Sequence, residues 1–388
     1  MKKNIIFYFL TVFITLFFTY SLLVIGDYFY HLYQYSKMRP TNDILTERKK
    51  KEDRKYLIEL KKNGFNKIIF PWFFHEYPEM SKKLIKDIVP VSAQPNDDVY
   101  YCNEGYGMIS FTTDRAGFRN NDKVWDRVAS EENILFIGDS YTQGACVQEN
   151  ETISSYFKDL NSINLGLDGN MPYVYTVLSK LYVPKIKPKY VIQIFHLNDD
   201  SDEGRIFKKN LYVKNLGQRY FKENSFEPSE EILSIISKTN NYVNQNLIRT
   251  PGVRDDLIAR GMRYLSLPTI RYNLNELLRS INYKLPYSTT LSINTLKNVC
   301  NENNCTPIFL YIPVSNYWED NKPLQKYYIK YLNEYFEEKN VHYLDISKEI
   351  FDMGKSAFAP KGKHLSPEGY KFVANQIKDK INKIEEEN

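Results

Sequence analysis

Metal-ligating residues are scarce in this sequence. It has only four cysteines and five histidines among 388 residues, and no two of them stand at the spacing of a zinc site. A calcium loop is also missing, because Asp199, Asp200 and Asp202 lack the glycine that accompanies such a loop. No nucleotide-binding loop is present either. We therefore expect solvated carboxylates at these positions, and a protein with neither a metal ion nor a cofactor.

Nucleic-acid binding is not indicated by the charge pattern. The net charge of +5 is small for this length, and no basic stripe with interleaved aromatic residues runs through the chain. The densest basic run, residues 48–51, lies in a polar segment, 48–63, that we predict to be a solvated helix. Repeats and low-complexity tracts are also lacking, so an ordinary folded protein is expected.

Charge is absent from one long stretch near the beginning of the chain, residues 5–25. About 20 apolar residues suffice for a helix to span a bilayer, whereas a cleavable signal has an apolar part of about 7 to 15 residues. We therefore predict an uncleaved signal anchor over residues 1–27. Lys2 and Lys3 favour a cytoplasmic amino terminus. The rest of the chain would then lie on the extracytoplasmic side of a bacterial-type inner membrane.

Beyond residue 130 the pattern changes to short apolar runs separated by helical stretches, which is typical of a parallel sheet covered by helices. The predicted strands are 134–137, 163–165, 190–195, 307–312 and 341–346. We predict a three-layer α/β/α domain in the flavodoxin-like strand order over residues 131–385. An insertion at about 203–286, helical in part, would form a lid or a substrate wall. Residues 28–130 form a juxtamembrane and N-terminal extension, to which the sequence assigns no role.

Two local predictions concern turns and cysteines. Alternating residues over 111–120 predict a hairpin that turns at Gly117. Cys300 and Cys305 flank a turn-like NENN segment, where an oxidising compartment would permit a short disulfide, although their spacing leaves the thiol state open. For Cys102 and Cys146 we expect free, buried thiols.

The segment ILFIGDSYTQG, residues 134–144, combines an apolar strand, a Gly-Asp-Ser turn and the start of a helix. Such a turn presents a serine at the carboxyl edge of a sheet, beside the positive end of a helix, where an alkoxide and an oxyanion are stabilised. This is the geometry of a nucleophile. A helix N-cap at Asp139 or Ser140 is the alternative that these residues leave open.

Three more polar segments follow later in the chain: NLGLDGN at 164–170, HLNDD at 196–200 and KHLSPEGY at 363–370. In a doubly wound sheet the loops at the carboxyl ends of the strands open on one crevice, so these segments can converge. Ser140 would then attack a carbonyl carbon with His364 as its base. The N–H groups of Ser140 and Gly169 and the side-chain amide of Asn198 would surround the oxyanion.

In this order and spacing, the four segments resemble the SGNH (GDSL-type) hydrolase superfamily, whose blocks supply Ser, Gly, Asn and His. The resemblance covers roughly residues 132–380, the insertion excepted. It implies Ser140 as nucleophile, His364 as base, and Gly169 and Asn198 as oxyanion donors. Gly166 is the alternative for the second block, although Gly169 has the usual offset in the family.

One position departs from the family pattern. The family usually has an aspartate three residues before the histidine, where it orients the imidazole, and this sequence has Lys361 there. We therefore expect a Ser-His dyad, in which a backbone carbonyl or another acid orients His364. Asp345 and Asp352 are the candidates for that acid.

The predicted function is that of a serine esterase that removes acyl groups, such as O-acetyl, from a cell-envelope carbohydrate or lipid. The substrate is implied by the resemblance, because envelope proteins with a similar anchor and a similar GDSYTQG block are often linked to bacterial surface polysaccharides. An O-acyltransferase would use the same acyl-enzyme with a sugar hydroxyl as acceptor. A non-catalytic carbohydrate-binding or assembly protein on the same scaffold is the third reading.

Overall fold

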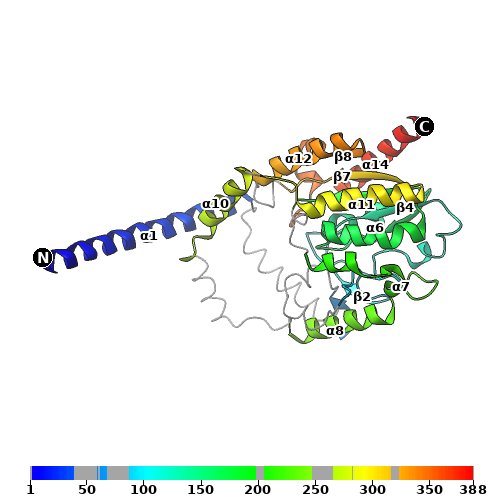
Figure 1. Ribbon diagram of the computed structural model, residues 1–388, viewed down its shortest axis with the longest axis horizontal. Helices are drawn as coiled ribbons and strands as arrows, with labels where there is room; N and C mark the ends of the chain where they lie inside the picture. Colours follow the sequence, from blue (N-terminus) through cyan, green and yellow to red (C-terminus); the bar gives the residue numbers. More distant parts are fainter. Residues whose placement is uncertain are drawn as a thin grey trace.

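The computed structural model describes residues 2–38, 59, 62–67, 87–197, 205–246, 265–281, 283–315 and 323–387. A long helix, α1 (Lys2–Met38), extends away from a compact α/β body (Figure 1). Within α1, the 24 residues Phe7–Tyr30 are long and apolar enough to cross a membrane, and none of the most apolar stretch is buried against protein. The predicted helix at 48–63 falls almost wholly outside the described residues.

The body is built on a five-stranded parallel sheet. Its strands are β4 (Asn133–Ile137), β5 (Asn161–Asn164), β6 (Tyr190–Phe195), β7 (Thr306–Tyr311) and β8 (His342–Asp345). They lie in the order β5-β4-β6-β7-β8, and every neighbouring pair is parallel. The order is that of flavodoxin-like folds, so the predicted fold class is confirmed. Each predicted strand is present, with its ends shifted by one or two residues at most.

Helices cover both faces of this sheet. Successive residues of a strand point to opposite sides, so each strand contributes to two hydrophobic clusters. Leu135 and Ile137 of β4 pack in the cluster that holds α6 (Pro172–Ile186), α11 (Tyr287–Asn303) and α12 (Pro323–Lys339). Ile134 and Phe136 pack in the other cluster, with α14 (Pro367–Glu387). The strands are therefore buried on both faces, which explains their nearly continuous apolar sequence.

Shorter elements complete the body: η1 (Asp122–Val124), α5 (Ser140–Gln143), η2 (Glu149–Glu151), η3 (Ser154–Tyr156), α13 (Ser347–Met353) and η5 (Gly354–Ala357). The described part of the insertion forms η4 (Arg205–Tyr212), α7 (Leu216–Tyr220), α8 (Glu230–Asn246) and α10 (Pro268–Ile281). The insertion is thus helical in part, as predicted. Its role as a lid or substrate wall stays a prediction.

The N-terminal extension is joined to this body through a shared hydrophobic core. Val91 and Phe118 are fully buried in the same cluster as α6 and α11. The N–H of Val91 also donates to the Tyr220 hydroxyl of the insertion, at 2.9 Å. A small sheet, β1 (Asn66–Lys67), β2 (Asp98–Tyr100) and β3 (Ser110–Thr112), lies in this extension.

The predicted hairpin over residues 111–120 is wrong. Strand β3 pairs antiparallel with β2 instead, and residues 114–118 form a tight loop. The reason is the buried Asp114 carboxylate, which accepts hydrogen bonds from the N–H groups of Ala116 and Phe118 and so removes them from any strand ladder. Gly117 does adopt the expected positive φ, 88°, and an added Cβ there would lie 2.2 Å from the Ala93 carbonyl oxygen.

Two disulfides are present, Cys102–Cys146 and Cys300–Cys305. The second is the short bridge that the sequence allowed. The expectation of free thiols at Cys102 and Cys146 is wrong, because the extension crosses the turn that follows α5 and brings the two cysteines together although they are 44 positions apart.

Candidate active site

The turn between β4 and α5 presents Ser140. Asp139 is the N-cap of α5, and its Oδ1 accepts a hydrogen bond from the N–H of Tyr141 at 2.9 Å. Gly138 is needed just before it, since an added Cβ would lie 2.0 Å from Thr142 Oγ1. Ser140 is the first residue of α5, so its N–H has no carbonyl one turn earlier within the helix. The capping role therefore belongs to Asp139, and the Ser140 hydroxyl is available for other contacts.

His364 reaches this serine from the loop before α14. Its Nε2 lies 2.9 Å from Ser140 Oγ. A bridge between Phe358 and Leu365 holds the loop, and the Tyr141 hydroxyl donates to the Lys363 carbonyl oxygen at 2.9 Å. The helix that carries the serine is thus tied directly to the loop that carries the histidine. The two residues that the sequence singled out are adjacent, although 224 positions separate them.

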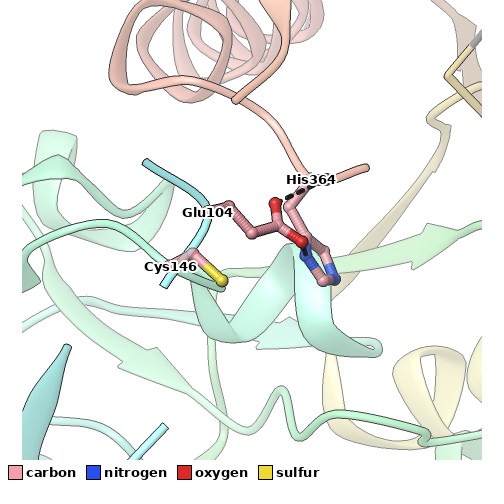
Figure 2. A group of neighbouring side chains, drawn as sticks. All are labelled: Glu104, Cys146 and His364. Atoms are coloured by element: carbon pink, nitrogen blue, oxygen red, sulfur yellow. Dashed lines mark hydrogen bonds and ion pairs between the residues drawn. The ribbon is translucent and has the colours of Figure 1, made fainter. Parts of the chain in front are cut away.

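The other imidazole nitrogen contacts a carboxylate that sequence reasoning missed. Glu104 Oε1 lies 2.9 Å from His364 Nδ1, and Oε2 accepts the backbone N–H of His364 at 3.0 Å (Figure 2). The acid comes from the N-terminal extension. It is neither Asp345, whose carboxylate accepts the N–H of Ser347, nor the exposed Asp352. The expected Ser-His dyad is therefore replaced by a Ser-His-Glu arrangement.

Local sequence explains how Glu104 fits there. An added Cβ at Gly362 would lie 1.8 Å from Glu104 Cδ, so only glycine leaves room for the carboxylate. The N–H of Lys361 donates to the Glu104 carbonyl oxygen at 2.9 Å, so position 361 contributes its backbone rather than a side-chain acid. The only feature of the sequence that could have drawn attention to Glu104 is its place between Cys102 and Gly105. This feature has no periodicity that would link it to His364.

The electrostatic environment favours an ionised Glu104. Burial raises the pKa of this carboxyl group, but hydrogen bonds and charge interaction with His364, together with the N–H of Lys363, outweigh it, so the net pKa is lowered. A carboxylate at Nδ1 favours the tautomer with its proton on that nitrogen. His364 Nε2 is then left as an acceptor for the Ser140 hydroxyl proton.

The two candidate glycines of the second block have different surroundings. The N–H of Gly166 is already used, because it donates to Asn164 Oδ1 at 2.8 Å, and an added Cβ would lie 2.4 Å from the backbone nitrogen of Gln143. Gly166 therefore serves close packing against α5. Gly169 has a φ of 69°, and its neighbour Asn170 donates from Nδ2 to the Gly138 carbonyl oxygen at 2.9 Å. Residues 169–170 thus adjoin the serine turn, while Asn198 lies outside the described residues.

A metal ion does not fit the cluster around Glu104. Within the described part of the chain, Glu104, Cys146 and His364 place possible ligand atoms within 4.8 Å of one another (Figure 2). Cys146 Sγ, however, is bonded to Cys102 Sγ and offers no thiolate. The disulfide instead joins the segment of Glu104 to the turn after α5. Arg119 fixes the same turn, donating to the carbonyl oxygens of Gly144 and Val147 at 2.6 and 2.7 Å.

No protein-family model and no curated protein matches the chain. Similar solved structures include a member of the lipolytic protein G-D-S-L family from Veillonella parvula DSM 2008, with 12% identity, coverage of 64% of this chain and 97% of that one, and a TM-score of 0.35. A GDSL-like lipase from Bacteroides thetaiotaomicron VPI-5482 has 12% identity, coverage of 65% and 89%, and a TM-score of 0.34. A catalytic mutant of an acetylxylan esterase from Geobacillus stearothermophilus has 14% identity, coverage of 64% and 94%, and a TM-score of 0.31. At these identities, function must be inferred from the residues of this chain.

Proposed function

We propose that this protein is a serine esterase in which Ser140 is the nucleophile, His364 the general base and Glu104 the carboxylate that orients the imidazole. The observation that carries the proposal is one unbroken chain of contacts. Ser140 Oγ lies 2.9 Å from His364 Nε2, and His364 Nδ1 lies 2.9 Å from Glu104 Oε1. These are the contacts that a serine hydroxyl needs in order to lose its proton during attack.

Acylation begins when Ser140 Oγ attacks the carbonyl carbon of an ester. The Oγ–H proton moves to His364 Nε2 as the new C–O bond forms, and the carbonyl oxygen becomes an oxyanion. Glu104 stabilises the resulting imidazolium without taking its proton. The tetrahedral intermediate then breaks the bond to the alcohol, which leaves with the proton from Nε2. A water molecule attacks the acyl-Ser140 by the same route and releases the carboxylic acid.

The oxyanion requires hydrogen-bond donors beside the serine. In our proposal these are the N–H of Ser140 in the first turn of α5, the N–H of Gly169 and the side-chain amide of Asn198. The position of Gly169 next to Asn170, which donates to the Gly138 carbonyl, supports its assignment. Loss of a single side-chain donor of this kind typically costs about 10²–10³ in kcat.

The position of Glu104 also favours an enzyme over a non-catalytic carbohydrate-binding protein. Taken alone, Lys361 slightly favours a non-catalytic protein, because it stands where the family usually has its aspartate. A partly buried carboxylate, 14% exposed and supplied from elsewhere in the chain, contacts the imidazole. A sugar-binding site has no need for a hydroxyl, an imidazole and a carboxylate in series, whereas proton transfer during acyl transfer does.

We further propose that α1 anchors the protein in a membrane and that the body lies on the extracytoplasmic side. Two disulfides support an oxidising compartment. Contacts between α1 and the insertion support an anchor that stays attached, since Asp27 of α1 accepts hydrogen bonds from Thr269 and Ile270. The substrate would be an acylated carbohydrate or lipid of the envelope. An acyltransferase would share the first half-reaction and differ in its acceptor.

The proposal is tested by labelling the detergent-solubilised full-length protein with a fluorophosphonate probe. Wild type and the control Ser356→Ala, an exposed serine outside the site, should be labelled. Ser140→Ala should not be labelled, and His364→Ala should react far more slowly. Circular dichroism would verify that each variant is folded. A folded wild type that stays unlabelled and hydrolyses no p-nitrophenyl acetate would overturn the proposal. Adding a sugar acceptor to the acyl-enzyme then separates transfer from hydrolysis.

A further inference from the structure

The carboxyl-terminal part of α1 is tied to the start of α10. Asp27 is only 2% exposed, and its two carboxylate oxygens accept the N–H groups of Thr269 and Ile270 at 3.3 and 2.7 Å. A side chain of α1 therefore caps the first turn of α10. The Tyr20 hydroxyl also donates to the Leu265 carbonyl oxygen, about two helical turns earlier along α1. Figure 1 shows α10 beside the end of α1, where that helix meets the body.

The tied segment carries an exposed apolar stripe. Leu265, Ile270, Leu274 and Leu278 are 49%, 40%, 52% and 58% exposed. On α10 the last three stand four positions apart, which places them along one side of the helix. Asn275, the next residue after Leu274, is exposed outside the stripe. Adjacent large apolar side chains left in water mark an interaction surface, since a soluble protein keeps such patches small.

We propose that residues 265–278 form a membrane-inserted segment, in which Leu265 lies in the hydrocarbon beside Tyr20. The stripe on α10, formed by Ile270, Leu274 and Leu278, lies near the hydrocarbon–headgroup boundary of the bilayer that α1 spans. The proposal rests on the membrane anchor proposed above. Tyr20 and Asp27 belong to the apolar 24-residue stretch Phe7–Tyr30, so whatever contacts them lies at the depth of that stretch. Leu265 is then the deepest position of the segment and Leu278 the shallowest.

The lengths of the elements agree with this placement. A helix of 24 residues extends about 36 Å, and the hydrocarbon core of a bilayer is about 30 Å thick. Asp27, three residues before the end of the stretch, therefore lies close to the membrane surface. A carboxylate at that depth is costly unless it is paired, and the two N–H groups of α10 supply its partners. A second anchoring surface beside α1 also fixes the tilt of the catalytic body against the membrane.

Site-directed labelling of the full-length protein in phosphatidylcholine–phosphatidylglycerol liposomes tests the proposal. All cysteines in the described residues are disulfide-bonded, so one introduced cysteine can be labelled without reduction. Leu265→Cys and Leu274→Cys report on the stripe, Asn275→Cys is the matched neighbour, and Tyr212→Cys, 76% exposed on the body, is the aqueous control. Each position receives an environment-sensitive fluorophore, which is then quenched by doxyl-labelled lipid and by aqueous iodide.

We expect doxyl lipid to quench the labels at 265 and 274 several-fold more than the label at 212, with 265 quenched most. Iodide quenching should show the reverse order, and the label at 275 should be more accessible to iodide than the label at 274. Iodide access at 265 and 274 equal to that at 212 would overturn the proposal. Protection from both quenchers would place a protein partner there and would also overturn it. Extraction of the protein by alkaline carbonate would instead refute the proposal that α1 is a membrane anchor. Fluorophosphonate labelling of the same samples tests the esterase proposal independently.

Discussion

Glu104 Oε1 lies 2.9 Å from His364 Nδ1, although 260 positions separate the two residues in the sequence. The carboxylate belongs to the N-terminal extension and the imidazole to the loop before the last helix. The extension is therefore more than a spacer between α1 and the body. In the proposed mechanism it supplies one of three catalytic side chains, so its packing against the body is a condition for activity.

Glu104→Gln should lower kcat by about 10³–10⁴ with little change in KM, because an amide cannot hold the required tautomer or stabilise the imidazolium. Glu104→Asp should retain more activity than Glu104→Gln. Hydrolysis of p-nitrophenyl acetate measures both. The control Lys361→Ala should stay within about twofold of wild type, since this exposed side chain is expected to make no catalytic contact. Full activity in Glu104→Gln would show that the glutamate is dispensable.

The lowered pKa of Glu104 predicts a pH-dependent contribution to stability. A carboxyl group whose pKa is lower in the folded state stabilises the protein above its unfolded pKa, about 4.3, and this stability is lost as the pH falls through the folded pKa. The difference in unfolding free energy between wild type and Glu104→Gln should therefore be largest above about pH 5 and shrink below about pH 4. Urea unfolding in detergent at several pH values measures it. A difference that grows in acid would contradict the assignment.

Removing the Cys102–Cys146 disulfide should affect both stability and activity. Chain entropy predicts a loss of about 4 kcal/mol for a loop of 44 residues and about 2 kcal/mol for the five-residue loop of Cys300–Cys305. Only the first bridge joins the Glu104 segment to the turn after the Ser140 helix. Paired serine substitutions at each bridge, compared by thermal unfolding and by ester hydrolysis below the melting temperature, test this. Equal kinetic effects of the two pairs would argue against a positioning role.

Gly166→Ala should destabilise the protein by about 1–3 kcal/mol and slow probe labelling, because the added methyl group would displace the backbone of α5. Gly217→Ala is the matched control. It lies in helix α7 with nothing within 4 Å of an added Cβ, so it should be neutral or raise stability by up to about 1 kcal/mol. Denaturant midpoints compare the two. A neutral Gly166→Ala would show that α5 can shift without penalty.

Local patterns in the sequence were enough for the sheet and for two of the three proposed catalytic residues. The five strands are short apolar runs that must be buried on both faces, and this property is visible without knowing their neighbours. Ser140 was recognisable because strand, turn and helix start follow one another within eleven residues. His364 was recognisable because its loop leads into a helix that begins at Pro367.

The sequence by itself thus determined the α/β/α class, the strand positions and the apolar amino-terminal helix, and it singled out the candidate serine and histidine, because each depends on residues that are neighbours in the chain. Only the tertiary structure decided that Glu104 contacts the imidazole of His364, that Cys102 pairs with Cys146, and that Asp27 caps α10. These contacts join segments tens to hundreds of residues apart. No hydrophobic period or turn signal encodes such a pairing, because it arises only when packing of the core brings the segments together.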